Sequence, residues 1–150
     1  MCNIMNLPVE NISVFNYPVR RLCYHRQEIL ENMISLKKKL KPDLVFAPST
    51  FDLHQDHQTV ASEAVRAFKD ISLMGYELPW NNINFSAQAF VILEKRHIEK
   101  KWQALQEYKS QLMLKRGYFS EDYIWSLARI RGQMVKSDWA EAFEVMRMTF

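Results

Sequence analysis

Residues 42–57 restrict the fold of this chain more than any other segment, because they read as a strand, a polar turn and the start of a helix. Residues 44–47 (Leu-Val-Phe-Ala) are continuously apolar and are bounded by Pro42 and Pro48. A short apolar run of this kind is typical of a strand buried on both faces, as in a parallel sheet. Residues 52–57 then place two imidazoles and two carboxylates within six positions.

The rest of the chain alternates strands with amphipathic helices. Apolar residues at helical spacing predict a helix over residues 24–40, ending near Lys41 because the residue before a proline is disfavoured in the right-handed α region. A second such helix is expected from about residue 57 to residue 68. Further strands are expected at 12–17, 89–93 and 140–147, and further helices at about 95–113 and 121–131. Ser120 is the expected N-cap of the last helix, and Gly132 the expected residue just after its end.

This order of elements predicts an α/β fold, a Rossmann-like layered sheet with flanking helices. Residues 72–85 look irregular, and two interpretations stay open for them. A long loop in a compact domain is often functional. Alternatively, Tyr76, Leu78 and Trp80 cover an edge of the core.

Composition narrows the class of protein. A chain of 150 residues with 48% hydrophobic content fits one domain, residues 1–150. A net charge of +3 and three glycines argue against a nucleic-acid-binding protein and against a glycine-rich phosphate loop. Cys2 and Cys23 form no disulfide framework, and no signal peptide or membrane span is recognisable. These features favour a cytoplasmic protein.

The run at residues 52–57 points to chemistry. Histidine and aspartate hold zinc and move protons near neutral pH, and ligands of open α/β sheets bind at the carboxyl ends of strands. The simpler alternative is a polar loop in which Asp56 caps the following helix. Six consecutive residues rarely surround a tetrahedral ion, so we do not expect a complete zinc site from this run alone. The other two histidines, His25 and His97, are expected at the surface.

Three segments together resemble the PIG-L/LmbE-like family of zinc-dependent deacetylases, which remove acetyl groups from N-acetylglucosamine-type sugars. Residues 42–48 with 52–57 look like the family's second signature. Lys101, Ala104, Leu105, Tyr108, Ser110 and Gln111 look like its later helix. Gly132 and the segment 140–143 look like its carboxyl-terminal signature.

One departure from the family pattern is large. Members open with a strand and a His-Pro-Asp-Asp-Glu loop, which supplies two zinc ligands and the general base. None of the four histidines here is followed by proline, and Asp-Asp-Glu does not occur. The resemblance therefore implies the carboxyl part of a deacetylase, truncated at the N-terminus and starting at an internal methionine, with residues 12–18 as the family's third strand.

The resemblance also implies roles for residues. His57 corresponds to the third zinc ligand, and His54 to the imidazole that stabilises the oxyanion or protonates the leaving amine. Asp56 or Asp52 orients an imidazole, and the residues leave that choice open. An arginine before the first long helix, Arg20 or Arg21, contacts substrate in related deacetylases; a solvated turn is the alternative.

Two functions follow from these expectations. The first is a zinc-dependent hydrolase that deacetylates an N-acetylglucosamine-type sugar or glycoconjugate, with Zn²⁺ as the expected cofactor. The second is a catalytically inactive binding or assembly protein on the same fold. Missing strands would leave a sheet edge exposed, and exposed edges seek partners, including a second copy of the chain.

Overall fold

The computed structural model describes residues 2–150, and the side chains from Ile4 onward. Its contacts group into two compact units, each formed by two stretches of the chain. One unit holds the residues up to Phe15 and Phe90–Glu141, and the other holds Asn16–Ala89 and Ala142–Phe150. The expectation of a single domain stays a prediction. Among the described residues, no helix is both long enough and apolar enough to cross a bilayer.

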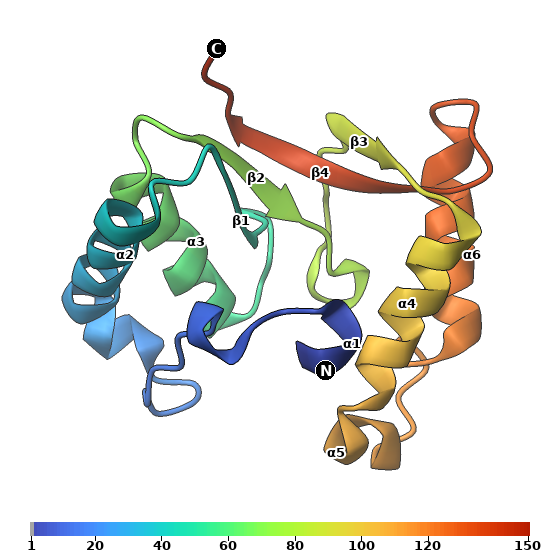
Figure 1. The fold of residues 1–150 in the computed structure, drawn as a ribbon, viewed down its shortest axis with the longest axis horizontal. Helices are drawn as coiled ribbons and strands as arrows, with labels where there is room; N and C mark the ends of the chain where they lie inside the picture. Colours follow the sequence, from blue (N-terminus) through green and yellow to red (C-terminus); the bar gives the residue numbers. More distant parts are fainter. Residues whose placement is uncertain (1) are drawn as a thin grey trace. The chain divides into compact units, whose positions relative to one another are not determined.

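The strands form a four-stranded mixed sheet in the order β1 (Leu44–Pro48), β2 (Ser72–Tyr76), β4 (Ala140–Arg147) and β3 (Ala89–Ile92) (Figure 1). β1 and β2 pair in parallel, whereas β2 and β4 are antiparallel. Helices flank the sheet, so the predicted α/β class is confirmed, together with the strands predicted at 89–93 and 140–147.

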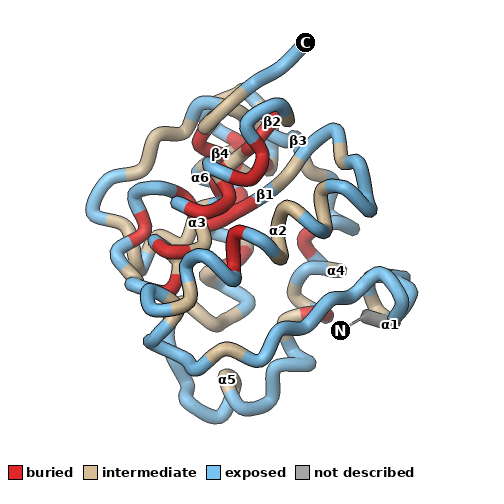
Figure 2. The backbone as a smooth tube through the Cα atoms, turned by 90° about the vertical axis from the view of Figure 1, so that its left-hand side faces the viewer, coloured by how far each residue is buried: buried red, intermediate tan, exposed pale blue. Residues whose placement is uncertain are grey.

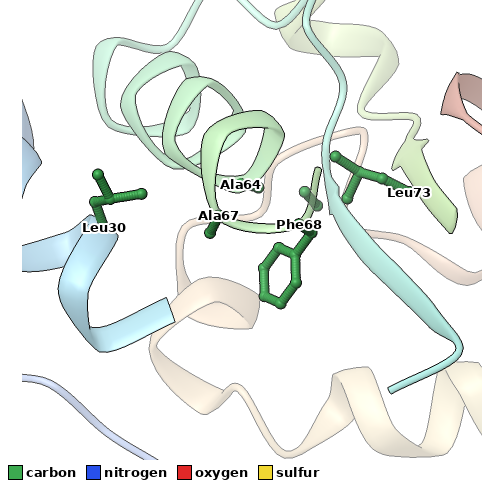
Figure 3. Close-up of a cluster of buried hydrophobic side chains, with 6 residues drawn as sticks. Leu30, Ala64, Ala67, Phe68 and Leu73 are labelled. Atoms are coloured by element: carbon green, nitrogen blue, oxygen red, sulfur yellow. The ribbon is translucent and has the colours of Figure 1, made fainter. Parts of the chain in front are cut away.

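The unit that contains β1 and β2 has its core between these strands and two helices, α2 (Arg26–Leu40) and α3 (Gln55–Ala67). Figure 2 shows buried residues along α3, β1 and β2. Figure 3 shows side chains from both helices and from β2 gathered in this core. The buried members are Leu30, Ala47, Ala64, Ala67, Phe68 and Leu73.

Both helices of this unit agree with their sequence patterns. α2 ends at Leu40, and Lys41 adopts a left-handed conformation with φ of 46° directly before Pro42. α3 begins two residues earlier than expected. Its N-cap is His54, whose side chain accepts from the Asp56 amide, so the interpretation of Asp56 as the cap is wrong.

Two strand predictions are corrected. β1 lies at one end of the described sheet, and its Leu44 and Phe46 are 40% and 49% exposed, so the strand is not buried on both faces. Residues 12–17 form no strand, and Val14 is 87% exposed. An alternating pattern becomes a strand only where a neighbouring strand pairs with it, and residues 12–17 belong to none of the strands of the described sheet.

β2 was not predicted, although it lies between β1 and β4. Its Ser-Leu-Met-Gly-Tyr sequence lacks β-branched residues and contains glycine, which is typical of a loop. Gly75 is required by a close approach instead. A Cβ there would lie 2.8 Å from Met146 Cε and 2.9 Å from Ser49 Cα.

The other unit is mainly helical, with α1 (Cys2–Met5), α4 (Lys95–Gln106), α5 (Lys109–Met113) and α6 (Glu121–Gln133). The helix predicted over residues 95–113 is interrupted at Glu107 and Tyr108. Ser120 caps α6 as predicted. Gly132 lies within α6, not after it. Glycine is required there by a close approach, since a Cβ would lie 2.6 Å from the Trp139 amide. This unit buries Ile98, Ile124 and Ala128, and packs against them Leu93, Trp102, Leu105, Tyr123, Trp125 and Trp139.

Candidate functional site

The candidate site lies where the parallel strands β1 and β2 end. Pro48 and Tyr76, their last residues, are register partners, so the loops that follow leave the sheet together. These loops meet again further on, because the Leu53 amide donates to the Asn81 carbonyl at 2.9 Å and Asp52 forms an isolated bridge with Asn82. Sheets of this kind bind ligands at the carboxyl ends of their strands.

A buried carboxylate organises the histidines. Asp52 is 1% exposed, and its Oδ2 lies 2.8 Å from His57 Nδ1. Its Oδ1 accepts from the His54 amide at 2.8 Å. A carboxylate can only accept, so His57 carries its hydrogen on Nδ1 and the neutral ring keeps a lone pair on Nε2. Carboxylate-bonded imidazoles of this tautomer are typical metal ligands.

His54 has the opposite arrangement. Its Nδ1 accepts from the Asp56 amide at 3.2 Å, so the neutral ring carries its hydrogen on Nε2. The two rings stack with their centroids 4.5 Å apart and their planes at 25°. In the neutral rings, His57 Nε2 can therefore accept a hydrogen bond or a metal, whereas His54 Nε2 can donate a hydrogen bond.

The structure shows which of the two aspartates contacts an imidazole through its carboxylate. The Asp56 carboxylate accepts from the backbone amides of Arg20 at 2.6 Å and Leu22 at 3.3 Å. Arg20 has a φ of 65°, so these bonds hold a turn that is unusual for a side-chain-bearing residue. The Asp52 carboxylate therefore orients the His57 imidazole, whereas the Asp56 carboxylate stabilises the backbone turn at Arg20. Both Arg20 and Arg21 are exposed.

Two polar residues of the site lie in the stretch expected to be irregular. Asn81 Nδ2 lies 3.5 Å from Asp52 Oδ2 and 3.4 Å from His57 Nδ1. Burial, and secondarily the charge of Asp52, raise the pKa of Tyr76 above its usual value near 10. The Asn81-Asn82 pair in a long loop was the available signal. Without knowledge of β2, nothing placed that loop beside the histidines.

The other two histidines lie elsewhere. His25 Nδ1 is 3.1 Å from Glu28 Oε1, one turn along the same segment. His97 Nδ1 accepts from the Glu94 amide at 3.0 Å and completes the capping box of α4. Both contacts are local and structural.

The candidate site offers one well-oriented nitrogen to a zinc ion. His57 Nε2, backed by Asp52, fits one ligand, whereas catalytic zinc has three protein ligands. In the part of the chain that the structure describes, no group of three or more His, Cys, Asp or Glu side chains is placed to hold a metal. The described residues therefore do not form a zinc site by themselves.

Comparison with known proteins agrees with the resemblance read from the sequence. The family model "PIG-L: GlcNAc-PI de-N-acetylase" matches residues 1–68. No curated protein matches this chain.

Solved structures share the fold at low sequence identity. Conserved protein TT1542 from Thermus thermophilus is 21% identical with a TM-score of 0.77, over 99% of this chain and 70% of that one. N,N'-diacetylchitobiose deacetylase from Pyrococcus horikoshii is 17% identical with a TM-score of 0.72, over 97% and 60%. The zinc-inhibited form of teicoplanin deacetylase Orf2 is 19% identical with a TM-score of 0.64, over 91% and 57%. This chain therefore spans less than two thirds of either deacetylase.

The same fold also carries a different chemistry. GalB, the 4-carboxy-2-hydroxymuconate hydratase from Pseudomonas putida KT2440, is 18% identical with a TM-score of 0.69, over 99% of this chain and 69% of that one. Because one fold serves different reactions, these likenesses establish the architecture alone, and the chemistry depends on the side chains of the site.

Proposed function

We propose that this chain, whose residues 1–68 match the PIG-L family, provides the two-histidine half of an N-deacetylase site. The proposed substrate is an N-acetylglucosamine-type sugar or glycoconjugate, whose acetamide is hydrolysed. The observation that carries the proposal is the pair of stacked rings with opposite Nδ1 contacts: His57 Nδ1 faces the Asp52 carboxylate, and His54 Nδ1 accepts from the Asp56 amide. Amide hydrolysis uses both a metal ligand and a hydrogen-bond donor at one carbon centre.

His57 is the proposed zinc ligand. The Asp52 carboxylate fixes its tautomer and ring orientation, so that Nε2 keeps the lone pair that a metal binds. Zinc, when bound, supplies Lewis-acid activation of the amide and of the attacking water. The other ligands must come from outside the set that the structure describes, and the family's His-Pro-Asp-Asp-Glu segment has the required chemistry.

His54 is the proposed donor. Its Nε2–H is free of the backbone bond that occupies Nδ1, so it can donate to the acetamide oxygen as negative charge develops there. A protonated ring can instead deliver a proton to the leaving amine. Either role needs the ring held in place, and the Asp56 amide and the stacking on His57 hold it.

Arg20 and Arg21 are the proposed substrate contacts. Asp56 holds the Arg20 backbone, and Asp56 is the immediate neighbour of His57 in α3. This turn therefore brings the backbone of two exposed arginines next to the helix start that carries the histidines. A hydroxyl-rich or anionic glycoconjugate offers acceptors for both.

The experiment combines metal analysis with an amine-release assay. The purified chain is loaded with Zn²⁺ and mixed with a fragment that bears the His-Pro-Asp-Asp-Glu segment, and N-acetylglucosamine conjugates serve as substrates. We expect zinc-dependent release of free amine. His57→Ala should lose bound zinc and activity together, whereas His54→Ala should keep zinc and lose activity by about 10²–10³-fold.

His97→Ala is the matched control, because His97 caps α4 and should leave activity unchanged. Absence of amine release from the complemented, zinc-loaded protein would overturn the deacetylase proposal. Hydration of an unsaturated carboxylic acid in the same mixture would instead assign the chemistry of the hydratase neighbour.

A binding or assembly protein is the second candidate, and the exposed edge of β1 favours it. Leu44 and Phe46 of this terminal strand remain 40% and 49% exposed. An open edge with apolar side chains recruits a partner, including a second copy of the chain. A strictly monomeric protein in light scattering, at high concentration, would exclude self-assembly.

A cytoplasmic location is proposed on the basis of cysteine usage. Cys23 is an exposed free thiol, and such thiols persist in reducing compartments. Labelling of Cys23 in intact and in lysed cells tests this location, because a cytoplasmic thiol reacts with an impermeant reagent only after lysis.

A further inference from the structure

A second buried carboxylate lies behind the site. Glu144 of β4 is buried, and its Oε2 accepts from Ser49 Oγ at 2.7 Å and from the Thr50 amide at 2.8 Å. Its Oε1 accepts from Thr50 Oγ1. The role assigned to the histidines uses none of these contacts. Three hydrogen bonds to one carboxylate tie the turn after β1 to a strand 94 residues away in sequence.

The turn that Glu144 holds leads directly to Asp52. The Ser49 carbonyl accepts from the Asp52 amide at 3.1 Å, and Ser49 Oγ accepts from the Phe51 amide at 3.1 Å. Ser49 itself is fully buried, and its amide donates to the Tyr76 carbonyl at 3.3 Å. The position of the Asp52 backbone is therefore fixed by a turn in which the Ser49 hydroxyl, the Thr50 amide and the Thr50 hydroxyl all donate to the Glu144 carboxylate.

The space for this carboxylate depends on Gly75. A Cβ at Gly75 would lie 2.9 Å from Glu144 Oε2 and 2.9 Å from Ser49 Cα. Only a residue without a side chain lets β2 pass this close to both groups. The arrangement is thus specified together by residues of β2, of β4 and of the turn after β1.

We propose that Glu144 is a positioning residue, which holds the 49–52 turn so that the Asp52 carboxylate meets His57 Nδ1. The sequence of contacts runs from Glu144 through Ser49 and Thr50 to Asp52, and from Asp52 to His57. The catalytic importance of this role rests on the proposed function. The physical claim does not, because it concerns the tautomer of one imidazole.

The test measures the ring nitrogens of His57 by ¹⁵N NMR with the ring in its neutral form. In the unaltered protein the Nδ1–H tautomer should dominate. Glu144→Leu keeps the size of the side chain and removes every acceptor, and should turn His57 into a mixture of both tautomers. Glu144→Gln should restore the Nδ1–H form, because its oxygen can replace Oε2 and its amide can donate to Thr50 Oγ1.

Thr50→Val covers the case in which Glu144→Leu fails to fold. It removes one hydroxyl at the turn surface, and should shift the tautomer in the same direction by a smaller amount. Glu63→Leu is the matched control. Glu63 is also a fully buried carboxylate, but it is held by Arg26 and Arg66 on α2 and α3. It should lower stability without changing the His57 tautomer.

Two results would overturn the proposal. One is an unchanged Nδ1–H tautomer in folded Glu144→Leu and Thr50→Val. The other is an equal tautomer shift in Glu63→Leu, which would show that general loosening of the unit is sufficient. Both readouts are independent of deacetylation, so an inactive protein can still confirm or refute the role of Glu144.

Discussion

The Asp52 carboxylate and the His57 imidazole form a partly buried hydrogen bond of 2.8 Å between residues five apart, across the start of α3. The bond fixes which ring nitrogen carries the hydrogen. Asp56, the other acid of the same run, accepts instead from the backbone amides of Arg20 and Leu22, so the roles of the two acids can be tested separately.

Asp52→Asn and Asp56→Asn should have different local effects. The first replaces the acceptor of His57 and should cost about 1.5–3 kcal/mol of unfolding free energy, as for hydrogen bonds to charged groups. The second should increase amide hydrogen exchange at Arg20 and Leu22, whose amides Asp56 accepts, and should leave the His57 tautomer unchanged. Urea unfolding and exchange NMR measure these effects. A change of the His57 tautomer in Asp56→Asn would contradict the conclusion that Asp52 alone of the two acids orients this ring.

Gly75→Ala should destabilise the protein by about 1–3 kcal/mol, because the new methyl group overlaps Ser49 Cα and the Glu144 carboxylate at 2.9 Å. Gly117→Ala is the paired control. Nothing lies within 4 Å of a Cβ there, and it should be neutral or stabilise by up to about 1 kcal/mol. Chemical denaturation of both variants gives the comparison, and equal stabilities would refute the close approach.

Tyr76 should ionise above the usual range for tyrosine, because burial, and secondarily the charge of Asp52, raise its pKa. Its neutral form therefore stabilises the fold fully below about pH 10, and this contribution is lost as the pH rises through the folded pKa. An ultraviolet titration of the unaltered protein minus that of Tyr76→Phe isolates the group. Tyr24→Phe serves as a control, since Tyr24 is 81% exposed.

The contribution of Asp70 to the free energy of unfolding should decrease as the pH falls into the acid range. The hydrogen bond from Lys37 is the largest cause that lowers the pKa of Asp70 below its usual value near 3.8. The contribution is therefore present above about pH 4 and is lost as the pH falls through the folded pKa. Lys37→Met should flatten the stability profile in the acid range, and Lys38→Met, a change to the neighbouring lysine, should not. Thermal melts across that range decide between them.

The local elements of this protein could largely be read from its sequence. The apolar stripe of α2, the proline after Lys41 and the serine before α6 act within one or two turns of the chain, so their effects appear in the residue order. The histidine run was found in the same way. The run follows a short apolar strand directly in the sequence, so its place in the fold is a local pattern. Its histidines and aspartates indicate metal binding or proton transfer.

Three features were decided by tertiary structure. β2 has a loop-like sequence, and it becomes a strand because β1 and β4 offer backbone partners on both sides. The choice of Asp52 over Asp56 for His57 depends on the direction in which α3 starts. Asn81 reaches the site because β1 and β2 are parallel, so that the loops after them leave the sheet at one edge. Glu144 reaches it because antiparallel β4 pairs with β2, with Gly75 as the register partner of Glu144. Contacts across such distances depend on sheet order, which a local pattern of residues does not contain.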